Sequence, residues 1–269
     1  MQGLYLYCLR EKTENSPGIS AKGIDGEEEV FTIPYKELEA VASKVSLEEF
    51  GSEEIQKKSQ EDLKWIKEKA VAHEKVIEAA MRDKNRILNV IPMGFGTIFK
   101  EKASLEETLN KDYAKVREIL DKIRGKQEWS VKIYLKDRRK LEQAVKEKNE
   151  AIKEKEKEMA ALPEGAAFFM EEELRELIAR EADKEAGNIA EEVFDALGKQ
   201  AGDCVKNKLL GKELTGRPEP MVLNAAYLVS EEKTGDFKKE IEDLNQKMQA
   251  KGFCVEYSGP WPAYNFTAF

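Results

Sequence analysis

The fold of the second half of the chain is decided by residues 129–135, WSVKIYL, and by the charged run that follows at 137–162, DRRKLEQAVKEKNEAIKEKEKEMAAL. In the first stretch every second residue from Trp129 to Leu135 is apolar, which is typical of a strand with one buried face. In the second stretch the apolar positions follow a heptad seam: Leu141, Val145, Ile152, Met159 and Leu162. A turn at Pro163 leads into a second apolar stripe that contains Leu174, Ile178, Ile189, Val193 and Leu197. A short turn between two helices makes them antiparallel neighbours, so we predict a long, coiled-coil-like helical hairpin over about 137–210.

Strand patterns return after Gly211. Residues 221–229, MVLNAAYLV, predict a central strand that is covered on both faces. A helix from Thr234 to Gly252 and an alternating strand from Phe253 follow. We interpret the order as strand, helices, strand, strand, helix, strand, which predicts a ferredoxin-like βαββαβ unit whose first crossover is enlarged into the hairpin.

The first half of the chain also mixes strands and helices. We predict strands at 4–9, 30–33 and 87–91, a helix that opens at Pro34, and a long helix over 59–81. A further helix begins with a capping box at Ser104 and ends at Gly125. The predicted fold class is therefore α+β, with two domains of ferredoxin-like βαββαβ character at 1–125 and 126–269, the second carrying the long antiparallel hairpin.

Composition excludes several classes of protein. The 269 residues are 41% hydrophobic and 36% charged, with a net charge of −8 and a mean hydropathy of −0.62. The chain is too apolar for a disordered protein, and no apolar run is long enough for a membrane helix. Its acidic balance argues against nucleic acid as a partner. We expect a cytoplasmic protein with no membrane insertion.

The chain lacks the signatures of a metal, cofactor or catalytic site. Cys8, Cys204 and Cys254 are scattered without a CxxC spacing, and His73 is the single histidine. The dinucleotide pattern that starts at Gly94 fails at its third glycine, and no phosphate loop or nucleophile elbow is present. We expect His73 to be a hydrogen-bonded structural histidine, and we predict no enzymatic activity, cofactor or metal.

Two segments are candidates for the fold's own contacts or for contacts with a partner. Residues 91–99, IPMGFGTIF, place two glycines around a phenylalanine, and we expect Phe95 and Phe99 to be presented on the surface. Residues 259–266, GPWPAYNF, combine two prolines with three aromatic rings. The tail either anchors a partner or, as we expect, packs back on its own sheet at Phe253, Val255 and Tyr257. The candidate residues are Pro92, Phe95, Gly96, Thr97, Phe99, Gly259, Pro260, Trp261, Pro262, Tyr264 and Phe266.

The same two segments resemble the gas vesicle protein F/L family of accessory proteins. GPWPAYNF is similar to the family's GPWPPYxF signature, with Ala263 at a position where proline is usual. The block that runs from His73 through Leu88 to Phe99 is similar to its HxxV … LPxxFGTxF pattern. The resemblance implies a two-domain α+β protein without enzymatic activity that supports the assembly of gas vesicles for flotation. It also implies a location in the cytoplasm and at the gas vesicle, with the major shell protein and other accessory proteins as partners.

Two alternatives come from other functional classes. Ferredoxin-like sheets host many functions, so a small-ligand regulatory domain or an enzyme is one of them. A coiled-coil scaffold that acts through the 137–210 hairpin alone is the other.

Overall fold

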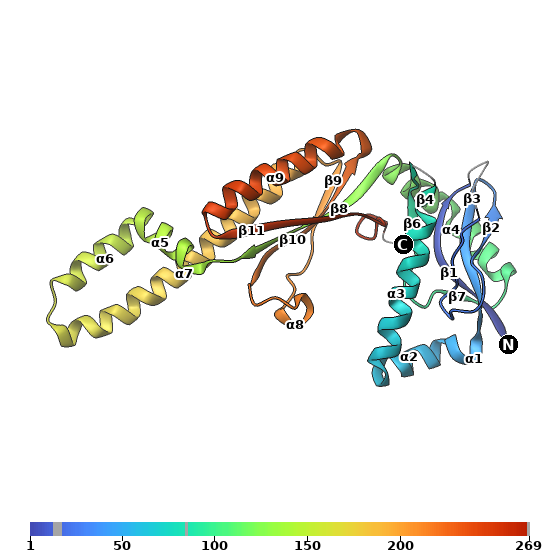
Figure 1. The fold of residues 1–269 in the computed structure, drawn as a ribbon, viewed down its shortest axis with the longest axis horizontal. Helices are drawn as coiled ribbons and strands as arrows, with labels where there is room; N and C mark the ends of the chain where they lie inside the picture. Colours follow the sequence, from blue (N-terminus) through green and yellow to red (C-terminus); the bar gives the residue numbers. More distant parts are fainter. Residues whose placement is uncertain (13–17, 84–85, 268–269) are drawn as a thin grey trace. The chain divides into compact units, whose positions relative to one another are not determined.

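The computed structural model describes residues 1–12, 18–83 and 86–267, and about half of the chain is helical. The chain divides into two compact units (Figure 1). Unit 1 comprises Met1–Glu128 together with Pro260–Phe269, and unit 2 comprises Trp129–Gly259. Each unit contains a sheet with helices packed on it, so the α+β prediction is confirmed.

Unit 1 is built around a sheet in which three long strands lie in the order β2-β3-β1, followed by β6. Its strands are β1 (Gln2–Glu11), β2 (Phe31–Tyr35), β3 (Leu38–Ser46), β6 (Val90–Pro92) and β7 (Ile98–Phe99), with β7 pairing to β1. The predicted helix at Pro34 is wrong, because Pro34 lies in the edge strand β2 and β3 follows after a short turn. An edge strand tolerates proline since its missing N–H is not needed by a second neighbour.

A β-bulge in β1 decides which residues face each side of this sheet. Leu6 pairs with Ala42, but Cys8 pairs with Val41, so Tyr7 is the extra residue. Simple alternation predicts Leu6 and Cys8 on one face, yet the bulge places Cys8 with Tyr5 and Tyr7 in one buried cluster. Leu6 and Leu9 therefore face the opposite side of the sheet.

Helices cover the sheet of unit 1. Residues Val76, Ile77 and Ala80 of α3 (Leu63–Ala80) are buried in the cluster that contains Tyr5 and Tyr7. The predicted helix over 59–81 is interrupted: α2 (Ser52–Glu61) ends before α3, and Asp62 caps α3 by accepting the Trp65 N–H. The helix α4 (Lys102–Ile123) contacts β1, β6 and β7. The remaining elements of unit 1 are short: α1 (Leu47–Phe50), β4 (Arg82–Asp83) and β5 (Arg86–Ile87).

The predicted capping box at Ser104 is not formed. The helix α4 already begins at Lys102, and the Ser104 hydroxyl donates to the carbonyl of Glu101 instead of accepting a backbone N–H.

Unit 2 contains a four-stranded sheet in the order β11-β8-β10-β9. The strands are β8 (Lys126–Leu135), β9 (Asp203–Lys206), β10 (Met221–Ser230) and β11 (Phe253–Trp261), and β9 pairs antiparallel with β10. Inward residues of β8 and β10 form one core with α7 (Glu164–Gly198) and α9 (Thr234–Ala250). The segment between β9 and β10, which includes α8 (Lys212–Thr215), reaches the sheet through Arg217, whose guanidinium lies 4.5 Å from the centre of the Tyr134 ring. A 3₁₀ turn, η1 (Glu231–Lys233), precedes α9.

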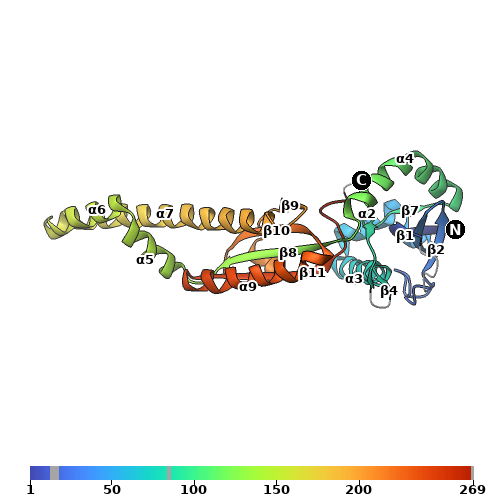
Figure 2. The ribbon, with the colours of Figure 1, turned by 90° about the horizontal axis from the view of Figure 1, so that it is seen from above.

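Two helices, α5 (Arg138–Lys148) and α6 (Glu150–Ala160), run beside α7, as Figure 1 and Figure 2 show. Asn149 separates α5 from α6 and caps α6, because its side-chain oxygen accepts the N–H groups of Ala151 and Ile152. The long helix α7 passes through Gly187 without a break. It ends at Gly198, so the predicted hairpin range of 137–210 wrongly includes the strand β9.

Candidate functional site

The two candidate segments meet in unit 1, at an apolar groove between the sheet and α4. The groove has a volume of about 450 Å³, within the roughly 300–1,000 Å³ that is typical of ligand pockets. Its base is formed by buried side chains of Leu6 and Leu9 from β1 and Leu105 and Leu109 from α4. The remaining lining residues are Pro92, Met93, Gly94, Thr97, Phe99, Thr108, Asp112, Tyr264 and Thr267. We call this site the unit 1 groove.

A buried polar network holds the turn that forms one wall of the groove. The Tyr5 hydroxyl accepts the Gly96 N–H at 2.9 Å and lies 3.1 Å from His73 Nδ1, while His73 Nε2 lies 3.2 Å from the Met93 carbonyl oxygen. Since a carbonyl can only accept, Nε2 carries the proton, and Nδ1 accepts the hydrogen bond that Tyr5 donates. The chain's single histidine thus ties α3 and β1 to the turn.

The electrostatics of this network favour a neutral imidazole. His73 is only 4% exposed, and burial lowers its pKa from 6.5 to about 4, although the Met93 carbonyl acts in the opposite direction. Burial also raises the pKa of Tyr5 above its ordinary value. Both groups are therefore uncharged near neutral pH, and we assign them a structural role.

The two phenylalanines of the 91–99 segment have different positions. Phe95 packs against the buried cluster, with its ring centre 6.4 Å from that of Tyr5 and 6.0 Å from that of His73. Phe95, which we expected to be presented, is thus half-buried with its ring against this cluster. Phe99 lines the groove, where β7 pairs it with Leu4. Gly96 has a φ of +82°, a conformation that glycine adopts without strain.

The C-terminal tail is anchored in unit 1 by a buried carboxylate. Glu128 is 3% exposed, and its two oxygens accept the Asn265 backbone N–H at 3.0 Å and the Asn265 side-chain amide at 2.6 Å. Burial raises the pKa of Glu128, and the two hydrogen bonds from Asn265 counteract this. Glu128 is not among the residues predicted for the site, although a carboxylate directly before the apolar strand pattern of 129–135 is a signal that could have pointed to it.

Around this anchor the tail residues are unequally buried. Ala263, Phe266 and Thr267 are buried, and Lys122 lies 5.6 Å from the centre of the Phe266 ring. Trp261 and Tyr264 remain 38% and 39% exposed.

We expected the tail to pack back on its own sheet at Phe253, Val255 and Tyr257. This prediction is wrong, because residues from Pro260 onward belong to unit 1. Its octet also continues β11 as far as Trp261, and Gly259 within it has a φ of +142° that favours glycine. Pro260 lies within this strand, and Pro262, which follows Trp261, is buried.

The rim of the groove carries a second tail contact. The Tyr264 hydroxyl donates to Glu74 at 2.6 Å, and burial, followed by this hydrogen bond, raises the pKa of Tyr264. Partial burial likewise raises the pKa of the Glu74 carboxyl. Among the described residues that line the groove, Asp112 alone has a charged side chain, so the site is suited to binding apolar side chains rather than to acid–base chemistry.

Thiols and metal-ligating groups do not form a second site among the residues that the structure describes. Cys8 is fully buried, which raises the pKa of its thiol to about 12. Across the described ranges no group of three or more histidine, cysteine, aspartate or glutamate side chains is arranged to hold a metal ion. Within the same ranges no helix is both long and apolar enough to cross a membrane.

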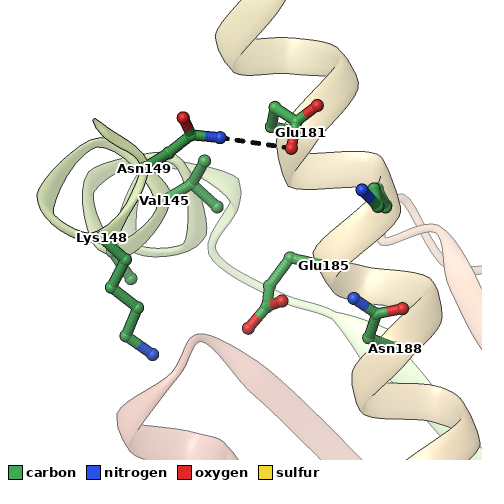
Figure 3. Close-up of a pocket in the computed structure, with 8 residues that line it drawn as sticks. Val145, Lys148, Asn149, Glu181, Glu185 and Asn188 are labelled. Carbon is green, nitrogen blue, oxygen red and sulfur yellow. Dashed lines mark hydrogen bonds between the residues drawn. The ribbon is translucent and has the colours of Figure 1, made fainter. Parts of the chain in front are cut away.

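A smaller, polar pocket of about 270 Å³ lies in unit 2 where α5 gives way to α6 (Figure 3). Asn149 donates to Glu181 of α7 across it at 3.3 Å. Its other lining residues include lysines, Glu185 and Asn188. Because both signs of charge are present, nothing in the pocket selects a ligand of one charge.

The fold defines an α+β protein with an apolar groove in unit 1. The chain belongs to the gas vesicle synthesis protein GvpL/GvpF family, whose sequence profile matches residues 3–268. It is 29% identical to gas vesicle protein F of Nostoc sp. over 73% of this chain and 75% of that protein. It is 24% identical to gas vesicle protein L of Streptomyces sp. over 97% of this chain and 91% of that one.

Solved structures agree on the fold. The crystal structure of the gas vesicle protein GvpF from Anabaena sp. matches with a TM-score of 0.74 at 22% identity, covering 100% of this chain and 99% of that chain. GvpF from Microcystis aeruginosa matches with a TM-score of 0.67 at 21% identity, with 99% of each chain covered.

Proposed function

We propose that this protein is an accessory protein of gas vesicle assembly that binds the small hydrophobic shell protein through the unit 1 groove. The observation that carries the proposal is the meeting of the two family-like segments, 91–99 and the C-terminal tail, at one apolar groove. A shell protein with a very apolar face needs a partner that covers this face before assembly and prevents aggregation.

The chemistry of the groove supports this role. Its base is made of leucines, which gain from excluding water but impose little directional selectivity. The hydroxyls of Thr97, Thr108 and Thr267 lie among them. Each donates to a backbone carbonyl of its own segment, so each can still accept an N–H group of a bound backbone. We therefore propose an apolar segment of the shell protein as the occupant, with a non-enzymatic role for the site.

The rest of the chain fits the same proposal. The sheet order β11-β8-β10-β9, with helices after β8 and β10, supports a ferredoxin-like βαββαβ plan for unit 2. The seam residues Ile152, Leu174 and Ile178 are buried within the unit, which argues against a scaffold that pairs through this seam alone. We further propose a location in the cytoplasm and at the gas vesicle, with other accessory proteins as additional partners.

The test fills the groove without removing a packed side chain. Thr108 lines the groove and is half-buried, whereas the adjacent Glu107 is exposed on the same helix. Thr108→Trp should abolish co-purification of the shell protein, while the matched control Glu107→Trp should leave it unchanged. Both variants should melt within a few degrees of the wild type. A correctly folded Thr108→Trp protein that still captures the shell protein would refute the groove as the binding site.

A further inference from the structure

Two phenylalanines lie exposed at the end of the hairpin in unit 2. Phe168 is 69% exposed and Phe169 is 74% exposed, and their ring centres lie 6.0 Å apart in an edge-on arrangement. Leu162, just before α7, is 38% exposed, so its predicted place in the apolar seam is wrong. The other phenylalanines that the structure describes are all buried or half-buried. We call Leu162, Phe168 and Phe169 the aromatic tip.

The aromatic tip is not required by the packing of the hairpin. The seam between α6 and α7 is already filled by Ile152 and Leu174, which are 0% and 5% exposed. Exposed aromatic rings carry a free-energy cost in water, and clusters of them on a soluble surface mark interaction sites. Aromatic residues are also the side chains that most often dominate the energy of an interface.

The charge around the aromatic tip selects the kind of partner. Residues 150–176 contain nine acidic and four basic side chains, a formal charge of −5. Some of these are paired, since Arg175 contacts Glu171 at 2.7 Å and Lys155 contacts Glu173 at 2.7 Å. The remaining excess is negative, so a second copy of the tip or an anionic membrane surface would be repelled. A basic partner would be attracted.

We propose that the aromatic tip is a docking surface for an amphipathic helix that carries lysine or arginine beside its apolar face. The rings bury against the apolar face, and the acidic side chains of α6 and α7 pair with the flanking cations. This surface is separate from the unit 1 groove and belongs to the other unit. The protein therefore has one surface for an apolar segment and another for a basic amphipathic segment.

The experiment uses the full chain and a defined probe. The probe is a fluorescent peptide of about 18 residues, long enough to form a helix, with leucine on one face and lysine on its flanks. A second peptide has glutamate in place of lysine. The variant Phe168→Ser with Phe169→Ser removes the rings, and the matched control Leu209→Ser with Leu214→Ser removes two leucines elsewhere in unit 2 that are 56% and 77% exposed.

We expect the lysine peptide to bind and the glutamate peptide not to bind. Affinity for the lysine peptide should fall about 30-fold in the phenylalanine variant, the effect of losing interface hot spots, and stay unchanged in the leucine control. Binding should weaken as salt is raised. Equal binding of both peptides, or an unaffected phenylalanine variant, would overturn the proposal. So would self-association or binding to anionic vesicles that depends on the two rings.

Discussion

Acidification should destabilise unit 1 through its single histidine. His73 is buried and neutral, with Nδ1 accepting from Tyr5 and Nε2 donating to the Met93 carbonyl. A second proton would remove the acceptor that Tyr5 needs and would place a charge in an apolar cluster. This is why burial lowers the pKa of His73 to about 4.

The sign and size of the effect follow from linkage. The pKa in the unfolded chain is near 6.5, so between pH 6.5 and about 4 the unfolded state binds a proton that the folded state does not. The histidine's contribution to stability is therefore fully present above pH 6.5 and is lost as the pH falls toward 4. At 1.36 kcal/mol per pH unit, the free energy of unfolding should fall by about 2 kcal/mol from pH 7 to pH 5, and by about 3 kcal/mol in total.

The measurement compares the wild type with His73→Gln, which cannot titrate in this range. Burial raises the pKa values of Glu74 and Glu128, so protonation of these carboxyls stabilises the folded state as the pH falls. Subtracting the variant removes that opposing contribution. Denaturant unfolding at pH 7 and pH 5 should show the wild type's advantage shrinking by about 2 kcal/mol, and the imidazole resonance should titrate well below pH 6. An unchanged difference, or a midpoint near 6.5, would refute the buried neutral assignment.

Three further outcomes are expected. Phe266→Ala should lower the free energy of unfolding by about 3–4 kcal/mol in denaturant titrations, whereas the half-exposed Trp261→Ala should cost clearly less; equal costs would contradict the burial difference. Glu128→Gln leaves a single oxygen for the two N–H donors of Asn265, so hydrogen exchange of the tail's backbone amides should accelerate by about tenfold or more. Unchanged exchange rates would show that Glu128 does not anchor the tail. Deleting residues 137–210 should unfold unit 2, because the deletion removes β9 and the α7 residues of its core. Circular dichroism would report the loss of structure, and a folded product would show that the sheet of unit 2 needs neither β9 nor α7.

Periodicity predicted the elements that bury one continuous face. The alternation of Trp129, Val131 and Ile133 predicted β8, and all three side chains lie in the core of unit 2. The strand β9 was missed, since its four residues are too few to show a period. The strand β3 was missed because Pro34 favoured a helix start, and only pairing with β1 and β2 shows that Pro34 lies on an edge.

The candidate site depended on contacts that no local pattern contains. The sequence singled out the 91–99 segment and the C-terminal octet. The prediction that the octet packs on the unit 2 sheet is wrong for the residues after Trp261, which belong to unit 1. The carboxylate of Glu128 decides this point, since it binds Asn265, which lies 137 residues further along the chain. A single buried pair of this kind leaves no repeat or spacing in the sequence.

By itself, the sequence determined the α+β class, the hairpin's apolar seam, the absence of catalytic signatures and the family, because each depends on local periodicity, composition or a contiguous motif. Only the tertiary structure decided that a bulge at Tyr7 turns Leu6 and Leu9 toward α4. It also decided that His73 bonds to Met93 in the turn that forms one wall of the groove, and that residues of the C-terminal tail line the same groove. The physical reason is that a groove is made of surfaces from distant parts of the chain, whose approach is set by strand register and buried hydrogen bonds.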